Sequence, residues 1–250
     1  SIKRLAFDIE VEVGDTMPDT SKALQRITAI SFHSDDRKQV YTLKRPEVAM
    51  GEEDIGRDYE IIWFDDEKEL LREAFQVIDS YPVVLTYNGD IFDMPYLCNR
   101  ANVLGLEYNP FKMMKEKATL NNGVHIDLYG VFSNRSLKIY AFGAKYITDK
   151  LDDVSEAMLG EKKVEYTGSL SDISLNLLSK YCYNDSRLTY ELSHYNNDLV
   201  MNLLVILCRI ANMPIDDISR LSISNWIKSM FYNEHRINGQ LIPRSVDFPR

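Results

Sequence analysis

The stretch "LAFDIEVEV" (residues 5–13) decides the fold of this chain. Its alternation of side chains is typical of a β-strand, in which residues two apart share one face, so Asp8 and Glu10 lie together. The apolar neighbours Phe7 and Ile9 indicate a strand at the centre of a sheet. Buried like charges raise each other's pKa and cost several kcal/mol unless a cation compensates them. The stretch therefore predicts a central strand that carries one wall of a metal site.

The composition of the 250-residue chain is that of a globular protein, with 45% hydrophobic side chains. It contains no long apolar run and no signal peptide, so we expect no membrane partner and a cytoplasmic location, near the nucleoid in a prokaryote. The net charge of −9 argues against a bulk nucleic-acid coat protein, but an enzyme with a small metal-assisted site for nucleic acid stays open. The three cysteines lack metal-ligand spacing and are expected to be buried thiols.

Apolar periodicity indicates an alternation of strands and helices. Strands are expected over 4–13, 26–43 (two strands joined by a polar turn), 60–64 and 82–88, and helices over 65–80 and 93–105. This order predicts an α/β fold.

The second half of the chain reads as mostly helical. Asn122-Gly123 predicts a hairpin over 117–127, and short helices are expected over 127–160. A long helical pattern, with room for one break, follows from 171 to about 213, and another helix with an extended exit covers 214–245. We therefore expect the sheet domain to be followed by a C-terminal helical extension.

Two further carboxylates stand where such a fold places chemistry. Asp93 comes where the strand 82–88 has ended and a helix begins, and Asp185 follows Tyr181 by four residues on one helical face. Each alone also fits a structural role, as a helix cap for Asp93 or a solvated acid for Asp185. With the strand pair, the four acids predict hard oxygen ligands for two Mg²⁺ or Mn²⁺ ions, which about 3.5–4 Å apart suit phosphodiester hydrolysis.

Three segments, in order, resemble the three exonuclease motifs of family B DNA polymerases: "AFDIEV" (6–11), "YNGDIFDMPYL" (87–97) and "YCYNDSRLTYEL" (181–192). The intervening segments and the tail toward the palm are also similar to that family, whereas palm motifs and the N-terminal domain are missing. The resemblance implies an RNase H-like mixed β-sheet flanked by helices. It implies an exonuclease domain over 1–212, a segment toward the missing palm over 213–250, and a fragment excised from an archaeal-like polymerase.

The resemblance also implies an activity, the two-metal-ion removal of nucleotides from DNA 3′ ends in proofreading. Asp8, Glu10 and Asp185 would hold one ion, Asp8 with Asp93 the other, and the Tyr181 hydroxyl would orient the attacking water. Histidine-type relatives carry their histidine where this chain has a lysine. The tyrosine-type DEDD subclass is therefore the better match.

Further residues receive roles from the resemblance with alternatives open. Asn88 and Phe92 would contact the terminal nucleotide, although Phe92 also fits core packing. Asp127 would support the metal site or cap a helix. Lys162 or Lys163 would reach the scissile phosphate or be solvated. The predicted hairpin is short for a role in separating primer from template.

The expected partners are a single-stranded DNA 3′ end and the rest of the polymerase chain, namely the palm, fingers, thumb and N-terminal domain. A sliding clamp would bind through regions outside this chain. Two alternatives stay open, an inactive exonuclease-fold scaffold or single-strand binding module, and a stand-alone RNase D-like RNA exonuclease. The intact acids argue against the first, and the palm-like tail argues against the second.

Overall fold

The computed structural model describes residues 2–13, 17–51, 58–115, 117–162 and 173–242. Within these residues, six strands form one mixed sheet in the order β4-β3-β2-β1-β5-β8. The strands of this sheet are β1 (Arg4–Val11), β2 (Ile27–His33), β3 (Lys38–Leu43), β4 (Glu60–Phe64), β5 (Val83–Thr86) and β8 (Val124–Asp127). Two further strands, β6 (Phe111–Met114) and β7 (Lys117–Leu120), form a separate two-stranded sheet. The α/β prediction and the central place of the first strand are thus confirmed.

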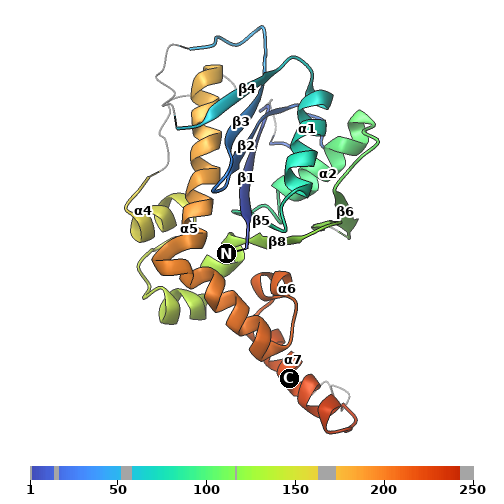
Figure 1. Cartoon of the computed structure of the whole chain (residues 1–250), viewed down its shortest axis with the longest axis vertical. Coiled ribbons are helices and arrows are strands. Elements are labelled where there is room, and N and C mark those ends of the chain that lie inside the picture. Colours follow the sequence, from blue (N-terminus) through green and yellow to red (C-terminus); the bar gives the residue numbers. More distant parts are fainter. Residues whose placement is uncertain (1, 14–16, 52–57, 116, 163–172, 243–250) are drawn as a thin grey trace.

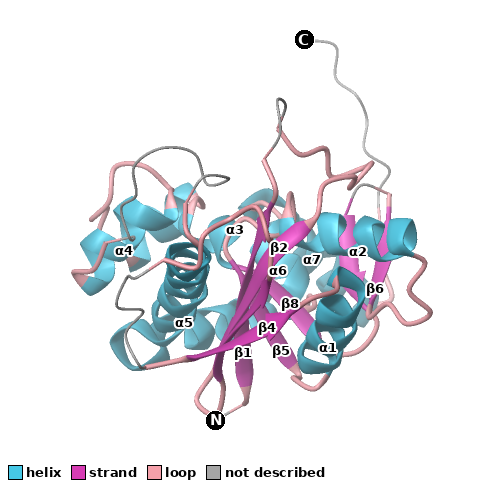
Figure 2. Ribbon diagram, turned by 90° about the horizontal axis from the view of Figure 1, so that it is seen from above, coloured by secondary structure: helices cyan, strands magenta, loops and turns pink. Residues whose placement is uncertain are grey.

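Helices cover both faces of the sheet (Figure 2). They are α1 (Glu67–Asp79), α2 (Asp93–Leu104), α3 (Leu128–Phe132), a π-helical turn η1 (Leu137–Ala141), α4 (Leu151–Leu159), α5 (Leu175–Ala211), α6 (Ile215–Arg220) and α7 (Ile223–Ile237). Figure 1 shows α1 and α2 on one side of the sheet and α5 on the other. Among the described helices, none is long and apolar enough to cross a membrane.

The alternation along β1 distributes its side chains between these two layers. Phe7 and Ile9 are buried in the core that the sheet shares with α1 and α2. Asp8 points to the opposite face, where the Cys182 thiol of α5 lies 3.9 Å from Asp8 Oδ2. Because side chains alternate along a strand, Glu10 belongs to this same face. One strand therefore supplies apolar packing to one layer and carboxylates to the other.

The predicted hairpin over 117–127 is wrong. The strand β7 pairs antiparallel with β6, and β8 instead joins the main sheet, parallel to β5. Gly123, at φ +83°, lies between the two strands, where an added Cβ would come within 3.0 Å of the Pro82 carbonyl. The Val124 N–H donates to that carbonyl at 2.9 Å. The glycine thus allows close passage beside β5 rather than a turn back onto β7.

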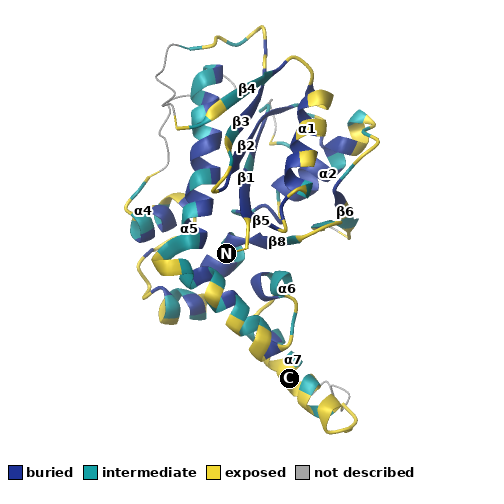
Figure 3. Cartoon of the chain, in the orientation of Figure 1, coloured by how far each residue is buried: buried dark blue, intermediate teal, exposed yellow. Residues whose placement is uncertain are grey.

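The long C-terminal helix has the break that its sequence left room for. Tyr195 to Asp198 leave helical geometry, and residues 196–198 adopt left-handed φ angles, which Asn and Asp tolerate better than most residues. The helix predicted over 214–245 is two helices, α6 and α7, separated at Leu221 and Ser222. Buried residues concentrate around the sheet, whereas α7 is largely exposed (Figure 3).

Candidate active site

The two carboxylates of β1 lie against the N-terminal half of α5. Asp8 is half-buried and Glu10 is buried. Ligand atoms of Asp8, Glu10 and Cys182 all lie within 4.8 Å of one another. Burial, with the charges of Asp8 and Glu10 adding to it, raises the pKa of the Cys182 thiol well above its usual value. The cluster thus combines two carboxylates with a neutral thiol at the centre of the sheet.

Helix α5 brings the third acid to this cluster. Asp185 is buried, and Tyr181 lies one turn earlier on the helix and is half-buried. The Ser31 hydroxyl of β2 donates to the Cys182 carbonyl at 2.8 Å. Because Cys182 lies between Tyr181 and Asp185, this bond fixes the helix to the sheet at the position of those two residues. The predicted positions of Tyr181 and Asp185 therefore fall on the part of α5 that packs on β1 and β2.

Asp93 is the first residue of α2, and its carboxylate reaches back to β1. The Ile9 N–H donates to Asp93 Oδ1 at 3.2 Å. Burial raises the pKa of Asp93 to about 7, and the nearby charges of Asp127 and Asp185 contribute. Phe92, not Asp93, occupies the cap position of the helix. Asp93 thus lies among the other acids instead of serving as the cap that was the alternative.

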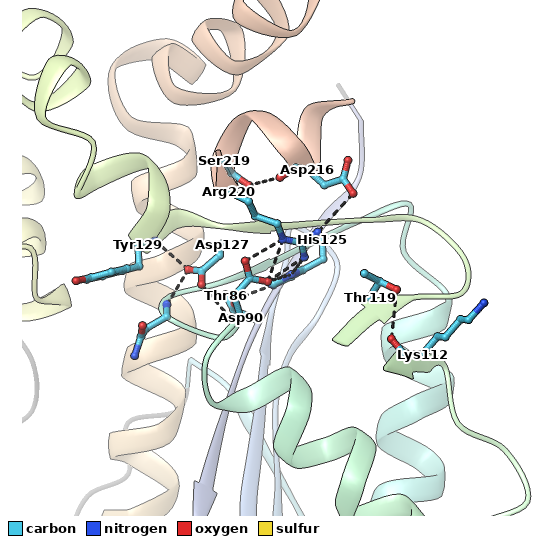
Figure 4. Close-up of polar contacts among 11 residues, drawn as sticks. Thr86, Asp90, Lys112, Thr119, His125, Asp127, Tyr129, Asp216, Ser219 and Arg220 are labelled. Atoms are coloured by element: carbon cyan, nitrogen blue, oxygen red, sulfur yellow. Dashed lines mark hydrogen bonds and ion pairs between the residues drawn. The ribbon is translucent and has the colours of Figure 1, made fainter. Parts of the chain in front are cut away.

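Asp127 holds the loop of residues 87–92 that precedes Asp93 (Figure 4). Its Oδ1 accepts from the Asn88 N–H at 2.7 Å and its Oδ2 from the Asp90 N–H at 3.0 Å. Oδ1 also accepts from the Tyr129 N–H at 3.0 Å, which caps α3. The cap alternative for Asp127 is therefore present, and the same carboxylate also supports the loop.

Phe92 fits the packing alternative in part. Its ring stacks on Tyr96 with centroids 5.4 Å apart, and it packs against the core while remaining half-buried. Lys162 is exposed, and its Nζ lies 3.0 Å from Glu156 Oε1. Lys163 lies outside the described residues. Contacts of Phe92 and the lysines with a nucleotide stay predictions.

A cavity of about 440 Å³ opens beside the carboxylates. It is lined by Asp8, Tyr87, Asn88, Tyr129, Lys150, Leu151, Asp152 and Asp185. Three of these residues, Tyr87, Tyr129 and Lys150, are not among the site residues predicted from the sequence. Tyr87 directly precedes Asn88, which is a usable signal, whereas the other two reach the cavity only through the fold. The cavity brings together two predicted metal ligands and one predicted nucleotide contact.

The donor set fits a divalent cation. Carboxylates arrive from β1, from α5 and from the start of α2, and oxygen donors of this kind suit Mg²⁺ or Mn²⁺. Burying several carboxylates close together costs free energy, and the raised pKa of Asp93 reflects that cost. A bound cation would lower this cost because its positive charge compensates the carboxylates. The residues present therefore fit a divalent metal ion, as the sequence predicts.

Comparison with known proteins gives the same family. The family model for the exonuclease domain of DNA polymerase family B matches residues 1–144. DNA polymerase 1 of Aeropyrum pernix is 39% identical over 96% of this chain, and DNA polymerase 1 of Saccharolobus solfataricus is 40% identical over 97%. The chain spans only 25% and 28% of those two proteins. A DNA polymerase of Methanocaldococcus jannaschii is 27% identical over 98% of the chain. The chain thus belongs to the exonuclease domain family of the family B DNA polymerases.

Proposed function

We propose that this chain removes nucleoside monophosphates from DNA 3′ ends, using two Mg²⁺ or Mn²⁺ ions, as the proofreading part of a family B DNA polymerase. The observation that carries the proposal is the convergence of Asp8, Asp93 and Asp185 from three separate elements. Glu10 adds a fourth acid from the same face of β1. Such a group of acids, three of them buried and Asp8 half-buried, costs stability in a fold without a cation, which favours a functional origin.

Each side chain has a role in this mechanism. Asp8, Glu10 and Asp185 would hold one ion, and Asp8 with Asp93 would hold the other. When bound there, the ions supply a lowered pKa for the attacking water and charge neutralisation at the departing 3′ oxygen. The Tyr181 hydroxyl orients the water by a hydrogen bond.

The substrate end is held by other residues. Asn88 lines the cavity and offers its side-chain amide to the terminal nucleotide. The half-buried ring of Phe92 offers a face on which a base stacks. Lys150, which also lines the cavity, pairs with a phosphate of the strand. Among the described residues, Lys150 is better placed for that task than Lys162.

This chain covers only about a quarter of the length of its relatives, so its partners include the other domains of such a polymerase. The substrate is a single-stranded DNA 3′ end, and the remaining partners are the palm, fingers, thumb and N-terminal domain of one polymerase. Residues 1–212 form the exonuclease domain, and residues 213–250 lead toward the palm. A sliding clamp binds through regions outside the chain. Action on DNA places the protein inside the cell.

The test is trimming of a 5′-labelled single strand by the purified chain with Mn²⁺. We expect stepwise shortening from the 3′ end. The double variant Asp8→Ala, Glu10→Ala loses charge stabilisation of the transition state, so we expect its trimming to be slower by about 10²- to 10³-fold or more. The matched control is Glu12→Ala, because Glu12 follows the same strand but pairs with Arg26 at 2.7 Å.

Three results would contradict the proposal. An untouched DNA strand would exclude an active exonuclease. Strand binding without trimming would favour the inactive single-strand module. Faster trimming of an RNA strand than of DNA would favour an RNase D-like enzyme.

A further inference from the structure

A buried ion pair joins the loop of residues 87–92 to α6. Arg220 Nε lies 2.8 Å from Asp90 Oδ2, and Arg220 Nη2 lies 2.9 Å from Asp90 Oδ1. The side chains of Arg220 and Asp90 are only 10% and 8% exposed. Two parallel charge-assisted bonds of this kind fix both the distance and the orientation of the partners. Arg220 therefore holds Asp90 rigidly from outside the loop (Figure 4).

The loop itself has a backbone that needs such support. Asn88 has a φ angle of +70°, in the left-handed region, which costs free energy for any residue with a side chain, although asparagine tolerates it better than most. A Cβ at Gly89 would overlap the Thr86 hydroxyl, so the loop passes directly over the end of β5. Local strain of this kind persists only where the surroundings fix it. The two carboxylates that do so here are Asp127, through backbone N–H groups, and Asp90, through Arg220.

His125 ties the ion pair to the sheet. Its Nδ1 lies 3.0 Å from Arg220 Nη2 and its Nε2 lies 2.8 Å from the Thr86 hydroxyl. His125 Nδ1 also lies 3.3 Å from Asp90 Oδ1, so the imidazole contacts both members of the ion pair. Burial raises the pKa of Asp90, but the bonds with Arg220 and His125 outweigh burial and keep it well below its usual value. Asp90 is therefore an ionised partner at neutral pH.

Helix α6 is packed tightly against α3. A Cβ at Gly130 of α3 would overlap the Ser219 carbonyl, so the two backbones are in direct contact. Ile218 and Ser219 are buried. Arg220 follows directly, and Asp216, one turn earlier, lies 3.5 Å from its Nη1. The guanidinium thus starts from a fixed backbone position.

We propose that Arg220 is a positioning residue of the exonuclease site, which acts through Asp90 to hold the loop that carries Asn88 and leads into Asp93. The inference rests on the proposed function. Arg220 lies outside residues 1–144, the part that matches the family model. The C-terminal segment is therefore a structural support of the site as well as a connection toward the polymerase.

The test compares Arg220→Met with Arg220→Lys in the whole chain. We expect Arg220→Met to lower kcat on single-stranded DNA by about 10- to 100-fold, because small displacements of reacting groups have effects of this size. KM should change less, and Arg220→Lys should recover part of kcat, since lysine keeps the charge without the two-pronged contact. A second readout is independent of activity. Hydrogen exchange at the Asn88 and Asp90 amides should become faster in Arg220→Met.

The matched control is Arg100→Met. Arg100 forms an equally buried pair with Glu67 between α2 and α1, with side chains 7% and 8% exposed. This variant should lower the melting temperature without the loss of kcat and without faster exchange in the loop. An equal loss of kcat in Arg100→Met would show a general effect of stability and overturn the proposal.

If Arg220→Met does not fold, Asp90→Asn tests the same contact from its other partner. It keeps the shape of the side chain and removes the charge, so we expect the same loss of kcat and the same loop exchange. Normal kcat and a protected loop in Asp90→Asn, or in a folded Arg220→Met, would overturn the proposal. A wild-type chain without trimming activity would instead refute the proposed function, while the exchange measurement would still decide whether Arg220 holds the loop.

Discussion

Asp93 is buried among other carboxylates, and its protonated form is therefore favoured in the metal-free protein. Its pKa is raised to about 7 by burial and by the charges of Asp127 and Asp185, against about 3.9 in an unfolded chain. A group with a raised folded-state pKa contributes stability that is fully present below the unfolded pKa. That stability is lost as the pH rises through about 7.

We expect the melting temperature of the chelated protein to fall between pH 5 and pH 8, by roughly 2–4 °C for each kcal/mol lost. Asp93→Asn, which cannot ionise, should be more stable than the wild type at pH 8 and should show a shallower fall. The exposed Glu73→Gln on α1 is the control and should follow the wild type. Equal pH profiles for Asp93→Asn and the wild type would contradict the assignment.

The residues of the site differ in how far the sequence reveals them. Alternation along a strand was enough to place Asp8 and Glu10 on one face, because that periodicity is local. Lys150 and Cys182 were missed as neighbours of these acids. Lys150 reaches the cavity from the start of α4, and Cys182 approaches Asp8 only because α5 crosses β1. Such contacts depend on tertiary packing, which no local pattern encodes.

At the scale of elements, the sequence predicted a helix correctly where its apolar periodicity coincides with the buried face. The helix α1 matches its expected range closely, since its acids lie in the first turn and its apolar residues share one buried face. The hairpin predicted from Asn122-Gly123 is wrong because a turn at these residues is compatible with more than one partner strand for β8. The parallel pairing of β8 with β5 competes with a hairpin to β7, and the residues of the turn do not record which pairing prevails.

The break in α5 is in contact with the start of β1. Arg4 Nη2 lies 2.8 Å from Asp198 Oδ1, and Arg4 Nη1 lies 3.2 Å from the Ser193 carbonyl. Arg4 is buried, so its loss leaves acceptors on both sides of the break without their donor. We expect Arg4→Met to lower the free energy of unfolding by roughly 1–3 kcal/mol, measured by urea denaturation.

The neighbouring Lys3→Met is the control for that experiment. Lys3 pairs with Asp36 at 2.6 Å, but both side chains are exposed, and such pairs contribute little. A loss in Arg4→Met no greater than that in Lys3→Met would show that the break in α5 does not depend on the arginine.

At the scale of the whole molecule, charge separates this chain from proteins that grip DNA over a wide surface. Its 38 acidic and 29 basic residues give a net charge of −9. A protein that contacts many phosphates is basic along its binding face and loses affinity steeply with salt. Here the lysine that lines the cavity is Lys150, whereas Lys162 is paired with Glu156. Under the proposed function, the chain should therefore engage only one or two phosphates of the DNA strand, and further phosphate contacts would come from other domains of a polymerase.

This difference in charge predicts a shallow salt dependence. At constant Mg²⁺, a plot of log kcat/KM on single-stranded DNA against log salt should have a slope of about −0.7 to −1.4, since each phosphate contact to a single strand contributes about −0.7. Lys150→Ala should reduce that slope by one contact and raise KM, because its ammonium neutralises a phosphate of the strand. The competing variant Lys162→Ala should change neither quantity. A slope several times steeper would reveal an extended phosphate track on this chain, and an unchanged slope in Lys150→Ala would remove that lysine from the substrate path.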